Sequence, residues 1–132
     1  MKRFSITAAI AICAASLLAA PALAEDRTPV QRQTLTELAF VLGQSHALRQ
    51  ACMGAEDQFW RERMTRLVAT ETPDPAFDTR LRDSFNAGFS QALAQYPSCG
   101  PDSRAAEART AARGKALSST LAREMAGDAS VR

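Results

Sequence analysis

The feature that most constrains the fold is a helical repeat of apolar residues in the second half of the chain. From residue 77 to residue 96 they recur every three or four positions, at Phe77, Leu81, Phe85, Phe89, Ala92 and Tyr96. This spacing places them on one face of an α-helix. Asp74 and Pro75 suit the N-cap and the first helical position, and Pro97 follows the last periodic residue. We therefore predict a helix from about Pro75 to Gln95.

A second periodic segment begins near residues 30–34 and ends at about Cys52. Its apolar residues share one side of a helical wheel: Leu35, Leu38, Val41, Leu42, Leu48 and Cys52. Gly54, just beyond the end, suits a C-terminal cap. Gly43 lies inside the helix, where glycine costs about 1 kcal/mol relative to Ala. We expect Gly43 to mark a close helix crossing.

Two further helices are predicted, at about Glu56–Glu71 and Asp102–Met125. The former has a stripe made of Trp60, Met64, Leu67 and Val68, with Glu56 and Asp57 in its first turn. The latter is rich in Ala, and its apolar face is thin. The sequence has no period-two alternation and no Asn-Gly or Asp-Gly hairpin signal. We predict an all-α fold, a small bundle of three to four antiparallel helices.

The N-terminus has the order of a secretory signal peptide. Met1–Arg3 is positive, residues 6–20 are uncharged and apolar, and Ala22–Ala24 gives an A-x-A cleavage site. The apolar run is shorter than the roughly 20 residues that span a bilayer. We predict cleavage after Ala24, a periplasmic location and no stable membrane anchor; a retained anchor is the alternative. Cys13 lies in the apolar run after Ile12, which does not suit a lipidation site.

Removal of residues 1–24 leaves one small domain with balanced charge. The expected division is a polar lead-in at 25–33, a helical domain at 34–126 and a frayed C-terminus at 127–132. The whole chain has sixteen Lys and Arg against fourteen Asp and Glu, and Lys2 and Arg3 account for the excess. No basic patch indicates nucleic acid or anionic lipid as a partner.

The two cysteines of the mature chain are Cys52 and Cys99. In an oxidising compartment they are expected to form a disulfide, worth on the order of 4 kcal/mol in the chain-entropy model. In an up-down bundle the first and third helices are parallel, so both cysteines fall at the same end. Free thiols or metal ligands are the alternative, although no C-x-x-C spacing is present.

Arg49 is the sharpest candidate for a functional or structural role. On the helical wheel it points toward the core or into a notch in it. A guanidinium there needs an acidic partner. Asp57 and Glu71 are the candidates on the next helix. A structural ion pair without a ligand role is one interpretation.

The other candidate site residues are His46, Trp60, Arg61 and Asn86. His46 suits acid–base chemistry or metal binding, although one hydrogen bond in a partly buried place is the simpler interpretation. No catalytic motif or phosphate loop is present, so we predict no catalytic residues and no cofactor. We predict no metal; a cuprous site at His46, Met53 and Met64 is the alternative. Arg82 and Asn86 border the apolar stripe of the third helix, where a polar pair can line a groove.

Four ordered sequence blocks resemble a known family. They are H-x-L-R-x-x-C at His46–Cys52, W-R-x-x-M at Trp60–Met64, F-N-x-G-F at Phe85–Phe89, and a second Cys at Cys99. Over about Leu35–Leu121 the chain resembles a family of small exported alphaproteobacterial proteins of unknown function. The resemblance implies no reaction.

These observations predict a non-enzymatic interaction or accessory module of the cell envelope. Its partner would be an unidentified envelope protein or a small ligand. The alternative is a small-ligand-binding protein or an enzyme whose site is built from His46, Arg49, Trp60, Arg61 and Asn86.

Overall fold

The computed structural model describes residues 27–131, and within them every regular element is an α-helix. The helices are α1 (Pro29–Met53), α2 (Phe59–Glu71), α3 (Pro75–Gln95) and α4 (Pro101–Val131). The prediction of an all-α bundle is therefore confirmed. The predicted signal peptide, its cleavage site and Cys13 lie outside the described residues.

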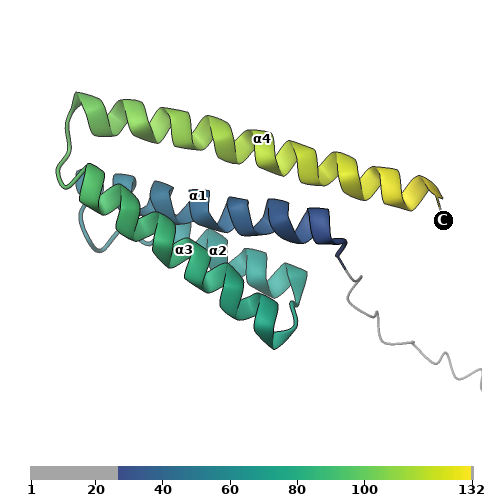
Figure 1. Ribbon diagram of the computed structural model, residues 1–132. Coiled ribbons are helices and arrows are strands. Elements are labelled where there is room, and N and C mark those ends of the chain that lie inside the picture. Colours follow the sequence, from purple (N-terminus) through teal and green to yellow (C-terminus); the bar gives the residue numbers. More distant parts are fainter. Residues whose placement is uncertain (1–26, 132) are drawn as a thin grey trace, which may run out of the picture.

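α1 is the central helix of the bundle. α2 and α3 pack on one side of it and α4 lies along another, as Figure 1 shows. α2 and α4 have no Cα atoms within 8 Å of each other in the described chain. α1 therefore holds most of the buried residues, because three helices cover it.

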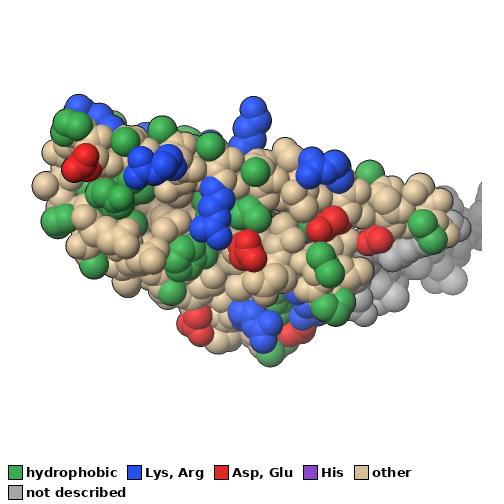
Figure 2. All heavy atoms as spheres, turned by 45° about the horizontal axis from the view of Figure 1, so that its top comes forward, with side chains coloured by type: hydrophobic (Ala, Val, Ile, Leu, Met, Phe, Trp, Pro, Cys, Tyr) green, Lys and Arg blue, Asp and Glu red, His purple; other side chains and the backbone are tan. Residues whose placement is uncertain are grey.

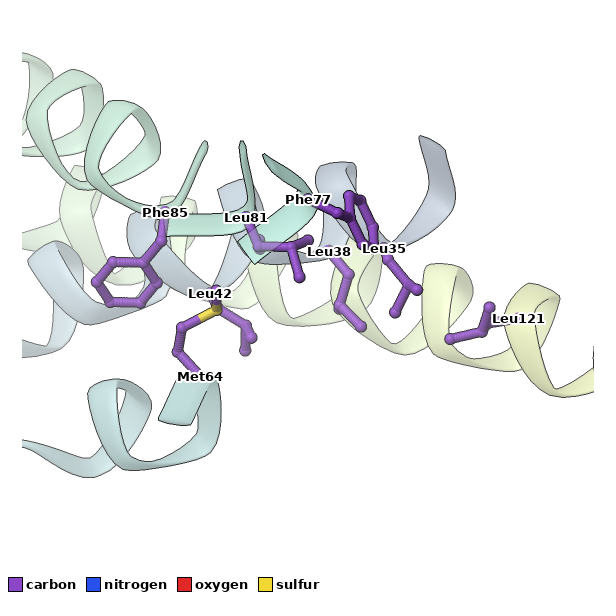
Figure 3. Packing of buried hydrophobic residues seen from close by; sticks show 9 residues of the cluster. Leu35, Leu38, Leu42, Met64, Phe77, Leu81, Phe85 and Leu121 are labelled. Atoms are coloured by element: carbon purple, nitrogen blue, oxygen red, sulfur yellow. The ribbon is translucent and has the colours of Figure 1, made fainter. Parts of the chain in front are cut away.

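The main core forms where α1, α2 and α3 meet, and α4 adds one side chain to it. Figure 3 shows the larger members pointing toward one another from these helices. They are Leu35, Leu38, Leu42, Met64, Phe77, Leu81, Phe85 and Leu121. Full burial of each such side chain stabilises the fold by about 1.5–3 kcal/mol before entropy is counted. Much of the apolar stripes read from the sequence faces this core, whereas Leu48, Phe89, Ala92 and Tyr96 pack in a second cluster with Ala47 and Ala106.

Capping explains where α1 and α3 begin. The Thr28 hydroxyl accepts a hydrogen bond from the amide of Gln31, and the Gln31 side chain accepts one from the amide of Thr28. This capping box starts α1 at Pro29, inside the segment expected to be a polar lead-in. The Asp74 carboxylate caps α3 by accepting from the amide of Phe77 at 2.9 Å, as the sequence predicts.

α2 begins at Phe59, three residues later than expected. The cause is Asp57, whose carboxylate accepts the amide of Phe59 at 3.2 Å in the preceding turn. Asp57 therefore sits before the helix, and the prediction that Glu56 and Asp57 form its first turn is wrong. This placement also gives the Asp57 side chain a different role, described below.

The disulfide between Cys52 and Cys99 is present, with the two Cα atoms 4.7 Å apart. It joins the end of α1 to the loop after α3, so the parallel arrangement of these helices is confirmed. A disulfide is consistent with an oxidising compartment. Among the helices in residues 27–131, none has the length and apolar character needed to cross a membrane.

α4 continues to Val131, through residues expected to fray. The side chain of Gln31 donates a hydrogen bond of 2.6 Å to the carboxylate of Asp128. This bond ties the last turns of α4 to the first turn of α1. Figure 2 shows the face that carries α4, where Lys and Arg side chains are spread along the surface and do not form one patch.

Candidate functional site

Arg49 forms an ion pair with Asp57. Its Nε lies 2.9 Å from both carboxylate oxygens, and its guanidinium lies 4.4 Å from the centre of the Phe59 ring. The hydrogen bond from Arg49 is the main reason that the pKa of Asp57 is lowered. The pair is partly exposed and lies near the end of α1. It holds the α1–α2 turn in place.

Asp57 and Glu71 were both expected as possible partners of Arg49, and the prediction of Glu71 is wrong. Glu71 accepts hydrogen bonds from Arg27 at 2.7 and 3.1 Å, in a pair that is mostly buried. Arg27 precedes α1 in the chain, and its pair with Glu71 ties that segment to the end of α2. A helical wheel places a residue on one side of its helix but does not fix which residue of another segment it reaches.

His46 is fully buried inside the bundle. Its ring packs against Phe85 and Phe89, with centroids 5.7 and 5.4 Å away, and neither ring nitrogen has a hydrogen-bond partner within residues 27–131. Burial is the main cause of a lowered pKa, and the nearby Arg61 charge lowers it further. The expectation of one satisfying hydrogen bond for His46 is therefore wrong. A neutral ring in this place has no access to a substrate.

The alternative cuprous site does not assemble. His46 is buried, whereas Met53 is 64% exposed at the end of α1. Within residues 27–131, no three His, Cys, Asp or Glu side chains are grouped so that they could hold a metal ion.

Arg61 and Asn86 do come together, in a hollow of about 150 Å³ between α2 and α3. We call it the Arg61 hollow; its lining residues are Arg61, Met64, Thr65, Arg82, Phe85 and Asn86. The Arg61 guanidinium lies 5.7 Å from the centre of the Phe85 ring. It forms no ion pair with an acid in residues 27–131, whereas Arg82 is bound to Asp78 one turn away.

Trp60 faces a different cavity, on the α4 side of α2. This cavity, the α4 pocket, has a volume of about 260 Å³ and is lined from three helices: by Leu38, Val41, Leu42 and Ser45 of α1, Trp60 of α2, and Thr110, Ala111, Gly114, Lys115 and Ser118 of α4. The Trp60 Nε1 is buried, and no described residue accepts a hydrogen bond from it. The Trp60 ring packs edge-on against Phe59.

The five candidate residues therefore divide among four places. Arg61 and Asn86 share a hollow, Trp60 lines a pocket across α2, His46 is enclosed in the core, and Arg49 secures a turn. Asn86 and Arg82 both line the Arg61 hollow, which agrees with the expectation that polar residues beside the apolar stripe of α3 can line a groove.

Two residues that now matter were not singled out in the sequence. Phe59 is contacted by two guanidinium groups, Arg49 at 4.4 Å and Arg63 at 3.4 Å from the ring centre. The Phe59 and Arg63 pair has the i, i+4 spacing of helix neighbours, so the sequence held a signal for it. Ser45 interrupts the apolar stripe of α1, and that interruption was the only signal for its place in the α4 pocket.

A family model described as "Protein of unknown function (DUF2385)" matches residues 29–125. The chain belongs to this family. The match covers α1, α2 and α3 and most of α4, including both cysteines and all five candidate residues. Neither the curated proteins nor the solved structures contain a match to the chain. Membership of the family therefore assigns no activity, and a function has to be argued from the residues.

Proposed function

We propose that the mature chain is a non-enzymatic interaction module of the periplasm, which uses the Arg61 hollow to bind an acidic side chain of a partner protein. The observation that carries the proposal is the Arg61 guanidinium, which lines an open hollow and pairs with no acid among the described residues.

The chemistry of the hollow favours a carboxylate. A guanidinium offers a planar set of donors that matches the two oxygens of a carboxylate, and such pairs are strong and directional. The Asn86 amide adds a neutral donor at the same hollow, whereas the Thr65 hydroxyl already donates to the backbone carbonyl of Arg61. Phe85 and Met64 give it an apolar floor, where a charged hydrogen bond is less screened than in water.

The size of the hollow favours a group presented by a larger partner. Pockets for free small molecules commonly measure about 300–1,000 Å³. The Arg61 hollow is about 150 Å³, enough for the end of one side chain.

The periplasmic location rests on the N-terminal sequence and on the disulfide. Residues 1–24 have the order of a signal peptide, and Cys52 and Cys99 are joined. The resemblance to exported alphaproteobacterial proteins points the same way. The absence of catalysis is supported by His46, the chain's only histidine, which is enclosed in the core.

Site-specific photo-crosslinking in the periplasm tests the proposal. A photo-reactive residue at Thr65 should capture a defined partner, and Arg61→Glu should abolish the capture through charge repulsion. Arg66→Glu is the matched control, because Arg66 is an exposed cation on α2 outside the hollow. It should leave capture intact.

The acidic group is then sought on the captured partner. A compensating change of one partner carboxylate to Lys should restore binding to Arg61→Glu. Equal loss with Arg61→Glu and Arg66→Glu would refute the proposed role of the hollow. So would tight binding of free acetate or phosphate at the hollow with no captured protein.

A further inference from the structure

The α4 pocket is separate from the Arg61 hollow, and the two share no lining residue. Its floor is apolar, made by Leu38, Val41 and Leu42 of α1. Trp60 of α2 forms one wall. Ala111 and Gly114 of α4 form the other.

The helix arrangement explains why this space stays open. α2 and α4 flank α1, and no Cα atom of one lies within 8 Å of a Cα atom of the other in the described chain. The α4 wall carries small residues, so no bulky side chain fills the gap. At Gly114 an added Cβ would lie 3.2 Å from Val41 Cγ1, which shows that α4 itself sits tightly on α1 beside the pocket.

Two polar side chains line this apolar pocket. Ser45 is only 2% exposed and belongs to the α1 side of the lining. The Trp60 Nε1 is buried and has no acceptor within residues 27–131. Buried donors are normally satisfied, so this unpaired nitrogen on a pocket residue calls for an acceptor.

A positive charge stands at the edge of the same pocket. Lys115 is an exposed residue of the α4 wall, and no acid of the described chain pairs with its ammonium. A ligand with an apolar body and an anionic head would therefore place its body against Leu and Trp side chains and its head near Lys115.

We propose that the α4 pocket binds a small amphipathic carboxylate, with its hydrocarbon part on Leu38, Leu42 and Trp60 and its carboxylate near Ser45 and Lys115. A volume of about 260 Å³ lies just below the usual range for drug-sized ligands, about 300–1,000 Å³, so the ligand is small. This inference is independent of the partner proposed for the Arg61 hollow.

Trp60 is the only tryptophan of the chain, so its fluorescence reports the occupancy of the pocket directly. Hexanoate is titrated into the mature protein and the Trp60 emission is followed. We expect a saturable change at millimolar or lower concentrations. Acetate lacks the hydrocarbon part and hexylamine carries the wrong charge, so both should bind at least tenfold more weakly.

Pocket variants locate the site. Ala111→Leu should fill the pocket and weaken hexanoate binding at least tenfold, whereas Ala112→Leu, on the same helix outside the pocket, should not. Lys115→Gln should weaken hexanoate several-fold while leaving hexanol unchanged. Arg123→Gln, elsewhere on α4, is its control. Circular dichroism verifies folding, and Lys115→Gln decides the matter if Ala111→Leu does not fold.

Three results would overturn the proposal. The first is no saturable response of Trp60 to hexanoate. The second is equal binding of hexylamine and hexanoate. The third is a response to anionic phosphatidylglycerol vesicles with none to free hexanoate, which would indicate a lipid surface and not a small ligand.

Discussion

Gly43 of α1 and Gly88 of α3 lie at a helix crossing where each glycine faces the backbone of the other helix. A Cβ on Gly43 would lie 2.9 Å from the amide nitrogen of Phe89 and still closer to the carbonyl oxygen of Phe85. A Cβ on Gly88 would meet the carbonyl oxygen of Phe40 in the same way. The close crossing expected from Gly43 is therefore confirmed, and it sets the depth of the core between α1 and α3.

Substitution at this crossing should be costly. Gly43→Ala or Gly88→Ala forces two helix backbones apart, and we expect a loss of at least about 1–3 kcal/mol, the usual cost of overpacking. Urea unfolding measures the change. Gly127→Ala is the matched control, since nothing lies within 4 Å of its Cβ position in α4. It should be neutral or stabilising by up to about 1 kcal/mol. Equal effects at Gly43 and Gly127 would contradict the crossing.

The disulfide should contribute a large share of the stability. Cys52→Ser with Cys99→Ser removes the constraint on the unfolded chain, and we expect a loss of about 2–5 kcal/mol. Thermal unfolding with and without reductant measures it in the wild type and the double variant. Reductant should lower the melting temperature of the wild type only. Free thiol in the denatured, unreduced protein would show that the bond is not formed.

His46 should make the fold sensitive to mild acid. Its pKa is lowered in the folded state, mainly by burial, from an ordinary value of 6.5. The unfolded chain therefore binds a proton that the folded chain resists, and stability falls as the pH drops below about 6.5. His46→Leu should remove this dependence between about pH 6.5 and pH 5. Because neither ring nitrogen is hydrogen-bonded, the variant should be at least as stable as the wild type at pH 7.

Urea midpoints across the pH range, compared for wild type and His46→Leu, provide the measurement. Asp57 and Asp74 do not contribute to the pH dependence above pH 5, because their pKa values are lowered from 3.8 and they titrate in more acidic solution. Parallel pH profiles for the two proteins above pH 5 would show that His46 is not the group responsible.

The Arg49 and Asp57 pair should govern the turn between α1 and α2. Arg49→Gln removes the main cause of the lowered Asp57 pKa, which should rise toward 3.8. The stability that the ionised Asp57 gives is present above pH 3.8 and is lost as the pH falls through its folded pKa; the variant should lack part of it. Carboxyl NMR titration follows Asp57 directly.

Arg82→Gln is the control for this pair. Arg82 binds Asp78 with a similar geometry, but on an exposed helix face, where such a pair adds little stability. It should leave both the Asp57 titration and the melting temperature nearly unchanged. An unaltered Asp57 pKa in Arg49→Gln would contradict the assigned partnership.

The sequence by itself determined the helices, their apolar faces and the disulfide. Each of these depends on short-range or simple information: the 3.6-residue period for Phe77, Leu81 and Phe85, the Asp74 cap, and the presence of only two cysteines after residue 24. The local sequence pattern did not predict the helix boundaries that depend on side-chain hydrogen bonds. α2 begins at Phe59, whose amide donates to the Asp57 carboxylate in the turn before the helix, and α4 stays helical to Val131, with Asp128 bound to Gln31.

Only the tertiary structure decided which candidate residues meet. Helical wheels fix the side of a helix on which a residue lies, but not the rotation, crossing and offset of one helix against another. Those are set by the packing at Gly43 and Gly88 and by the capped turns. As a result, Arg49 pairs with Asp57 and Glu71 pairs with Arg27. Arg61 and Asn86 line one hollow, and Trp60 lines a pocket with α4. The separation of the five candidates into distinct places follows from that packing and was not contained in the spacing of the residues.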